Sequence, residues 1–240
     1  MIKRVTRYRL WIWRVLWVLV HLVRPLVCRV RIEGTAHVPA EGGGVVACNH
    51  TLGVDWILLG YASPRELYYM AKAEAFQINR FTTWMMRTGG VFPVHRGKND
   101  VAALANAIDL ARAGKLIGMF PEGTRSRNGA LRRAKTGAAR IAMEAHVPVI
   151  PAAVVNGPAL LTSWKRLRRP LIMVRFGPPL QRSLRAGEDA SHAARDFTDA
   201  IMAGIAAALP PGLRGEDAHT HAAPGGNGSP ARANRGSERK

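Results

Sequence analysis

The sequence predicts an α/β fold: a mixed, mostly parallel sheet flanked by helices, with an N-terminal interfacial membrane helix or bent helix pair. Two observations predict it. Short apolar runs alternate with stretches in which apolar residues recur every three or four positions. The first thirty residues form a separate, basic and apolar segment. The chain has 240 residues, which is room for one substantial domain with a full core.

The expected elements alternate along the chain. The strands are expected at 44–48, 67–71, 91–94, 116–120, 149–155 and 171–176. The helices are expected at 54–61, 81–88, 101–111, 135–145 and 191–209. Asn99 or Asp100 can cap the third helix and Ser191 the last one. Strands that alternate with helices indicate a sheet with helices on its faces.

We expect residues 1–30 to form a membrane-associating helical segment. Residues 1–31 hold eight basic residues and no acid. Arg7, Arg14 and His21 share one helix face, and Trp11, Trp13 and Trp17 supply indoles of the kind that favour the lipid headgroup level. The expected arrangement is a helix, or a helix pair broken at Pro25, that lies in one leaflet with its polar stripe toward water.

Other interpretations of this segment are a spanning helix or a core helix of a soluble fold. The apolar run at 10–23 is short for a full crossing, which needs about 20 residues. A signal peptide would need an uncharged apolar core and a small-residue cleavage site, and neither is evident. Val27 is not the small residue that a lipoprotein site at Cys28 would need.

The remaining chain divides into a folded domain at 31–209 and a tail at 210–240. The tail consists largely of Gly, Pro, Ala, Ser and Arg, so it is expected to be disordered. The formal net charge of +19 favours anionic partners, either nucleic acid or an anionic membrane. The sparse pair Cys28 and Cys48 fits a reducing compartment.

A histidine and an aspartate in the first motif suit acid–base chemistry. His50 follows an expected strand, at the end where open α/β sheets bind their ligands. A neutral imidazole is a natural general base, and Asp55 can orient its other ring nitrogen if His50 lies in the turn. By itself, this spacing is more often structural than catalytic.

Two further motifs offer groups that bind phosphate and polyols. In the segment 120–126 a strand ends in a proline, a charged residue and a glycine, where backbone amides become available. Glu122 can accept hydrogen bonds from a polyol or orient a neighbour, and Arg125 can bind phosphate as a forked donor. Arg96, just after the strand at 91–94, is a second candidate, although a solvated loop arginine is an alternative. The scattered histidines predict no metal site.

With these motifs in this order, the chain resembles the glycerolipid acyltransferase family. The resemblance covers about residues 30–180 and four blocks. Its first block is Asn49, His50 and Asp55; the others are 90–96, 120–126 and 147–152. Leu52 stands where many relatives carry serine, and His95 where an acidic or other polar residue is common. These departures leave the acceptor headgroup open.

The resemblance implies that 31–209 is a catalytic domain and that His50, held by Asp55, deprotonates a glycerol hydroxyl. The hydroxyl oxygen would attack the thioester of acyl-CoA or acyl-acyl carrier protein, with no cofactor and no covalent acyl-enzyme. The implied acceptor is 1-acyl-sn-glycerol-3-phosphate or another lysophospholipid. Its phosphate and glycerol would be held by Arg96, Glu122, Gly123, Thr124 and Arg125.

The expected location is the cytoplasmic face of the cell membrane, as a peripheral or monotopic protein on anionic lipids. An alternative is a basic protein that binds nucleic acid or a membrane surface, but no nucleic-acid motif is present. A serine hydrolase would need a Gly-x-Ser-x-Gly elbow, which the chain lacks.

Overall fold

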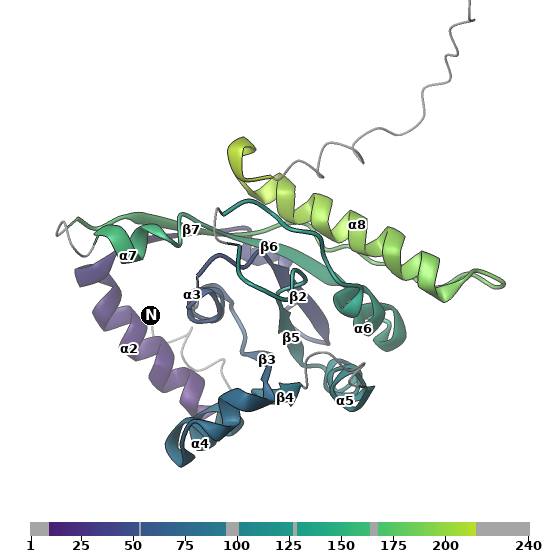
Figure 1. The fold of residues 1–240 in the computed structure, drawn as a ribbon, viewed down its shortest axis with the longest axis horizontal. Helices are drawn as coiled ribbons and strands as arrows, with labels where there is room; N and C mark the ends of the chain where they lie inside the picture. The colour runs from purple at the N-terminus through teal and green to yellow at the C-terminus, as the bar shows by residue number, and fades with distance from the viewer. Residues whose placement is uncertain (1–9, 53, 95–100, 127–128, 164–167, 215–240) are drawn as a thin grey trace, which may run out of the picture.

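The fold is built around one seven-stranded sheet (Figure 1). The structure is a computed structural model that describes residues 10–52, 54–94, 101–126, 129–163 and 168–214. Within them the strand order is β1-β7-β6-β2-β5-β3-β4. Every neighbouring pair is parallel except β6 and β7, so the predicted mixed, mostly parallel sheet is confirmed.

The elements follow the expected alternation closely. The strands are β1 (Arg29–Glu33), β2 (Gly44–Cys48), β3 (Leu67–Lys72), β4 (Phe92–Val94), β5 (Leu116–Met119), β6 (Val149–Val155) and β7 (Leu171–Phe176). The α-helices are α2 (Trp11–Val27), α3 (Asp55–Ala62), α4 (Arg80–Thr88), α5 (Val101–Arg112), α6 (Gly137–Ala145), α7 (Ala159–Ser163) and α8 (Ala190–Ala208). Short 3-10 turns lie at Thr35–His37, Ala73–Gln77 and Pro211–Leu213.

The sheet separates two apolar cores, which makes three layers. On β2, Val45 and Ala47 pack against α5, α6 and α8, whereas Val46 and Cys48 pack against α2 and α3. Alternate residues of a strand point to opposite faces, so a central strand covered on both sides must be apolar throughout. Every residue of β2 and β6 is accordingly buried.

Two helix starts differ from the sequence-based expectation. Helix α8 is capped by Asp189, whose side chain accepts a hydrogen bond from the backbone N–H of His192, and not by Ser191. Helix α6 begins at Gly137, two residues later than expected. The proposed caps Asn99 and Asp100 lie outside the described residues.

Within the described residues from 10 onward, one helix, α2, precedes strand β1, and this helix is not broken at Pro25. Helix α2 runs through Pro25 and ends two residues later. Strand β1 then pairs in parallel with β7 at the edge of the sheet. The expected boundary at residue 30 therefore falls inside a strand. Sequence reasoning missed β1 because three of its five side chains are charged.

Helix α2 has one face against the protein, contrary to the expected exposure of two of its three indoles. Trp13 and Trp17 are buried, and the Nε1 atom of Trp13 donates a hydrogen bond to the carbonyl of Gly89 at 3.0 Å. His21 stacks on Trp17 and hydrogen-bonds the hydroxyl of Tyr61, so it faces the protein and not water. The core-helix interpretation holds for this face alone.

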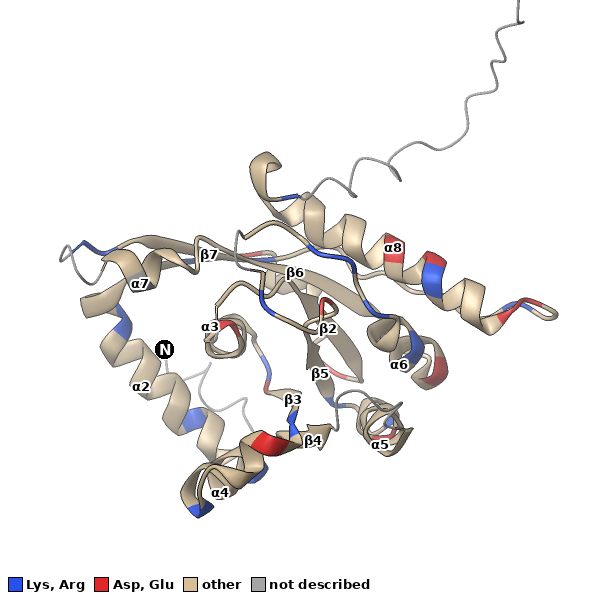
Figure 2. Cartoon of the chain, in the orientation of Figure 1, with Lys and Arg blue, Asp and Glu red and all other residues tan. Residues whose placement is uncertain are grey.

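The opposite face of α2 is apolar and exposed. Its exposed side chains are Trp11, Val15, Val18, Leu19, Leu22, Val23, Leu26 and Val27. Helix α2 carries basic but no acidic side chains (Figure 2). Exposed aromatic residues of α4 continue this surface, because the rings of Trp11 and Trp84 lie 5.9 Å apart. No described helix is long and apolar enough to cross a membrane.

The C-terminal boundary lies later than expected. Pro210–Arg214 were assigned to the disordered tail, but a 3-10 turn forms at Pro211–Leu213. Leu213 packs against the core and accepts a backbone hydrogen bond from Leu131 at 3.3 Å. The rest of the tail, residues 215–240, lies outside the described residues.

Candidate active site

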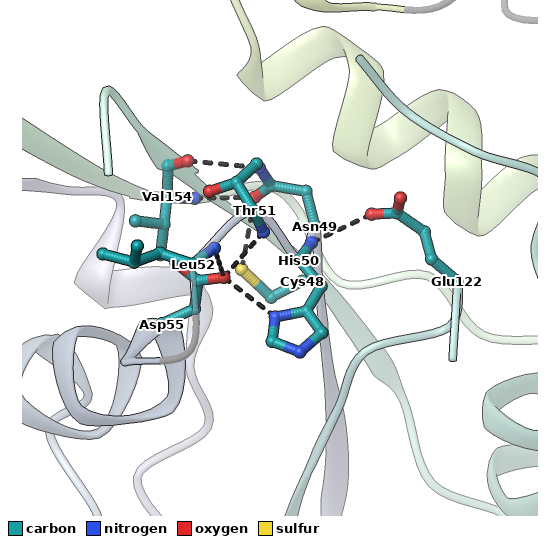
Figure 3. Close-up of polar contacts among 8 residues, drawn as sticks. All are labelled: Cys48, Asn49, His50, Thr51, Leu52, Asp55, Glu122 and Val154. Atoms are coloured by element: carbon teal, nitrogen blue, oxygen red, sulfur yellow. Dashed lines mark hydrogen bonds and ion pairs between the residues drawn. The ribbon is translucent and has the colours of Figure 1, made fainter. Parts of the chain in front are cut away.

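His50 and Asp55 meet at the carboxyl end of β2 (Figure 3). The strand ends at Cys48, and α3 begins at Asp55, so His50 occupies the turn as expected. The Nδ1 atom of His50 lies 2.9 Å from Oδ2 of Asp55. A carboxylate at Nδ1 fixes the tautomer with its proton on that atom, which leaves Nε2 as an acceptor. In Figure 3 the Nε2 side of the ring points away from Asp55.

The carboxylate of Asp55 is fully buried and anchored by the turn. Its Oδ2 atom also accepts hydrogen bonds from the backbone N–H groups of Thr51 and Leu52, both at 2.7 Å. Asp55 lies in the first turn of α3, where the helix dipole stabilises a negative charge. Several donors converge on one oxygen, so the carboxylate is positioned before any substrate arrives.

The loop that follows β5 holds His50 from another side. Oε1 of Glu122 accepts the backbone N–H of His50 at 2.9 Å, and the backbone N–H of Ser126 donates to the carbonyl of His50 at 2.7 Å. The ring of Phe120 stacks on the imidazole with centroids 4.4 Å apart. The main chain and ring of His50 are thus both fixed by this loop.

Asn49 joins the turn that holds His50 to the sheet. Its buried side-chain amide donates to the carbonyl of Val154 at 3.1 Å and accepts from the N–H of the same residue at 2.8 Å. The neighbouring Cys48 donates its S–H to Asn49. Burial, reinforced by the negative charge of Asp55, raises the pKa of the Cys48 thiol well above its usual value. Cys48 therefore stays protonated and does not act as a nucleophile.

His50 lines a cavity of about 560 Å³. One part of its wall is apolar and aromatic, with Phe120, Tyr69 and Trp13 in succession; their ring centroids are 6.3 and 6.2 Å apart. The other part is polar and basic, and comprises Gly123, Lys135, Thr136, Gly137 and Arg140. A base beside a cavity with an apolar and a cationic wall suits a substrate that is both lipidic and anionic.

The described residues contain no group of three or more His, Cys, Asp or Glu side chains that could hold a metal ion. Residues 29–155 match the family model described as Acyltransferase, and this range includes the whole His50–Asp55 turn and the loop after β5. The chain belongs to the acyltransferase family.

Curated relatives of this acyltransferase share one name. The 1-acyl-sn-glycerol-3-phosphate acyltransferase of Bacillus subtilis is 32% identical over 155 residues, which are 64% of this chain and 75% of that protein. The protein of the same name from Borreliella burgdorferi is 26% identical and overlaps 53% of this chain and 52% of its own length. Against the human alpha form, the match spans 48% of that protein at 27% identity.

A solved structure shares the fold of the acyltransferase. It is the crystal structure of the 1-acyl-sn-glycerophosphate acyltransferase PlsC from Thermotoga maritima. The TM-score is 0.60 at 22% identity, and the match covers 79% of this chain and 76% of that chain.

The expected substrate ligands of the acyltransferase lie in different environments. Glu122 is buried and turned toward backbone N–H groups, those of His50 and Arg132 at 2.9 and 3.2 Å, and away from the cavity. Gly123 lines the cavity. Thr124 and Arg125 are exposed on the same loop and do not line it. Arg96 and His95 lie outside the described residues.

Several residues that shape this site were not singled out from the sequence. Phe120 and Ser126 hold His50, and their roles depend on contacts with a residue 70 and 76 positions away. Lys135 and Arg140 line the cavity from the start of α6. Their position at a helix start after the third motif is the only sequence signal that could have drawn attention to them.

Proposed function

We propose that this acyltransferase moves a fatty acyl group from a thioester donor to the free hydroxyl of 1-acyl-sn-glycerol-3-phosphate, which gives phosphatidic acid. The names of the curated relatives support the reaction and the acceptor. The observation that carries the proposal is the 2.9 Å contact between His50 Nδ1 and Asp55 Oδ2, at the wall of a cavity large enough for a lipid substrate.

In the proposed mechanism, Nε2 of His50 removes the proton of the acceptor hydroxyl as its oxygen attacks the thioester carbonyl. The new C–O bond forms, and the C–S bond then breaks in the tetrahedral intermediate. The proton on Nε2 passes to the departing sulfur, so the products are an ester and a thiol. Asp55 stabilises the transient imidazolium and holds the ring in register.

The substrates are proposed to occupy different parts of the cavity wall. The acyl chain lies along Phe120, Tyr69 and Trp13, where burial of methylene groups contributes about 0.8 kcal/mol each. The glycerol lies beside Gly123, which keeps the reacting hydroxyl near His50. Arg125, which does not line the cavity, and Arg96, which lies outside the described residues, are proposed to bind the phosphate. The donor is acyl-CoA or acyl-acyl carrier protein.

We also propose that the enzyme works at the cytoplasmic face of the cell membrane as a peripheral or monotopic protein. The apolar outer face of α2, with Trp84 and Phe81 of α4, supports this location. The net charge of +19 favours anionic lipids, and each basic residue near such a surface contributes about 1 kcal/mol. Trp13 and Met85 line the cavity from these same two helices, so a lipid acceptor has a short path to His50.

An acceptor panel with labelled acyl-CoA tests the reaction. Lysophosphatidic acid should be acylated faster than lysophosphatidylcholine or glycerol-3-phosphate. The His50→Ala variant should lose acyl transfer and keep its circular dichroism spectrum, whereas His192→Ala, which alters an exposed histidine of α8, should keep activity. Full activity of His50→Ala would remove the proposed base, and a preference for lysophosphatidylcholine would replace the acceptor.

A further inference from the structure

The cavity beside His50 has a cationic wall to which Arg125, the expected phosphate ligand that the structure describes, does not contribute. Lys135 and Arg140 line it beside Thr136 and Gly137, and no described lining residue is a carboxylate. We propose that Lys135 and Arg140, which are both exposed, form a phosphate-binding subsite at this wall of the cavity. This inference rests on the proposed function, because that reaction brings phosphate groups to the cavity on its acceptor and on its coenzyme A or carrier-protein donor.

Lys135 is fixed against the loop that also holds His50. Its backbone N–H donates to the carbonyl of Pro121 at 2.9 Å. Its side chain then crosses Gly123: Cε lies 3.5 Å and Nζ 3.8 Å from the point where a Cβ on that glycine would stand. Gly123 has a φ of +68°, a conformation that glycine adopts without strain. The ammonium group is therefore placed next to the residue at which the substrate glycerol is proposed to lie.

The positive charge of this wall is not neutralised within the described protein. Glu122, the nearest acid along the loop, uses its two oxygens for the backbone N–H groups of His50 and Arg132. Lys135 forms no ion pair with any described residue, and Arg140 has only a long contact with Glu144 at 3.9 Å. Two cations without a close counter-ion at a cavity wall favour an anionic ligand.

The start of α6 adds backbone donors to the same wall. Thr136 precedes the helix and makes no side-chain capping bond, so the first N–H groups of α6 have no partner from this residue. Thr136 and Gly137 both line the cavity. The helix dipole points its positive end toward a phosphate held by Lys135 and Arg140, and thus supports binding by the two side chains.

Steady-state kinetics with matched substrates tests the subsite and identifies its phosphate. The variants are Lys135→Ala, Lys135→Arg, Arg140→Ala and the control Arg133→Ala, an exposed arginine that does not line the cavity. The acceptors are lysophosphatidate and the matching monoacylglycerol, which lacks the phosphate. The donors are acyl-CoA and the acyl thioester of pantetheine, which also lacks phosphate.

The expected result for Lys135→Ala and Arg140→Ala is a KM raised roughly tenfold or more for a phosphate-bearing substrate only. A rise confined to lysophosphatidate assigns the subsite to the acceptor, and a rise confined to acyl-CoA assigns it to the donor. Lys135→Arg should recover most of the loss, and Arg133→Ala should change nothing. Unchanged KM values, or equal losses for substrates with and without phosphate, would overturn the subsite.

Calorimetric titration of the His50→Ala protein with lysophosphatidate and with coenzyme A separates this inference from the proposed function. Adding Lys135→Ala to the His50→Ala protein should raise the Kd for one of these two ligands by about the same factor as the KM. If the wild-type enzyme acylated no lysophospholipid, the proposed function would fail while this binding result stood. Binding of both ligands that is insensitive to Lys135 would remove the subsite whatever the activity.

Discussion

Oε1 of Glu122 accepts a hydrogen bond from the backbone N–H of His50 at 2.9 Å. The carboxylate is buried and its other oxygen accepts the N–H of Arg132 at 3.2 Å. Glu122 thereby joins three chain segments: the turn after β2, the loop after β5 and the segment that leads to α6. Of the two roles that the sequence suggested for Glu122, these contacts agree with the orientation of a neighbour, here the backbone of His50.

Glu122→Gln should lower kcat and leave KM for the acceptor nearly unchanged. One amide oxygen can still accept from His50, but the amide NH₂ then faces the N–H of Arg132, donor against donor. Loss of a charge-assisted hydrogen bond costs about 1.5–3 kcal/mol, so kcat should fall roughly ten- to a hundredfold. Glu41→Gln, an exposed exchange of the same chemistry, is the control for kinetics measured side by side. A raised KM for the acceptor at constant kcat would instead indicate that Glu122 binds the acceptor.

The contribution of Glu122 to the free energy of unfolding should decrease as pH rises, whereas that of most carboxylates increases. Burial raises the pKa of this carboxyl above its usual value, although the N–H groups of His50 and Arg132 oppose the shift. The folded state then binds the proton more tightly than the unfolded state. The contribution of Glu122 is present below about pH 4.5 and is lost as pH rises through the folded pKa.

Urea unfolding of the wild type and of Glu122→Gln between about pH 4 and about pH 7 measures this contribution. The free energy of unfolding of the wild type, taken relative to the variant, should decrease as pH rises. In this difference the contributions of the other carboxylates cancel, because both proteins contain them. A difference that stayed constant or increased would mean that the carboxylate is better solvated than its burial indicates.

Asp55→Asn should reduce kcat far more than it reduces stability. An asparagine oxygen can keep the N–H groups of Thr51 and Leu52, at 2.7 Å in the wild type, but it cannot stabilise an imidazolium. Loss of the orienting carboxylate should cost at least about a hundredfold in kcat. Rapid-quench measurement of acyl transfer tests this, and thermal unfolding of the same variant is the check on folding. Near-normal kcat in the variant would mean that Asp55 stabilises the turn and has no part in catalysis.

Exchange of outward leucines on α2 should release the protein from lipid. Leu22 and Leu26 are 66% and 80% exposed. Burial of each leucine side chain in a membrane would contribute about 1.5 kcal/mol or more to the binding free energy. The double change to serine should therefore weaken vesicle binding about a hundredfold. Leu184→Ser, which alters an exposed leucine far from α2, is the control for flotation with anionic vesicles. Unaltered flotation of the double variant would place the contact elsewhere.

Gly60→Ala should destabilise the fold even though alanine favours helices. A Cβ at Gly60 in α3 would lie 2.4 Å from Cζ3 of Trp13. Overpacking of this kind costs about 1–3 kcal/mol, which exceeds or matches the gain of about 1 kcal/mol from helix propensity. Thermal unfolding should show a lower Tm than for Gly212→Ala, where no atom lies within 4 Å of the new methyl group. An equal Tm for both would show that the indole moves without cost.

Apolar periodicity was sufficient to predict most of the sheet. Strands β2, β6 and β7 have the predicted bounds because their sequences are largely apolar and are flanked by Gly, Pro or Asn residues. Strand β1 was missed although Val30 and Ile32 alternate with charged residues, because two apolar positions make a short signal beside the long apolar run that precedes it. The pairing of His50 with Asp55 was predicted from spacing and a strand end.

The remaining parts of the site depend on long-range contacts. Nothing local indicates that Glu122 turns toward the backbone of His50, 72 positions away. The indoles of α2 misled for the same reason: Trp13 and Trp17 suit either lipid or protein, and only packing against Tyr61 and Tyr69 decides between them. Tertiary context thus determined which side of each amphipathic element faces inward.

The hydrogen bond from Trp13 to Gly89 makes α2 part of the cavity wall as well as its outer cover. Removal of α2 would therefore also remove Trp13 and Leu16 from the cavity wall. Engineers should instead keep the helix and replace only its outward aliphatic side chains with polar ones. If α2 holds the protein on a membrane as proposed, such a protein would keep the Trp13 part of the cavity wall and bind lipid more weakly.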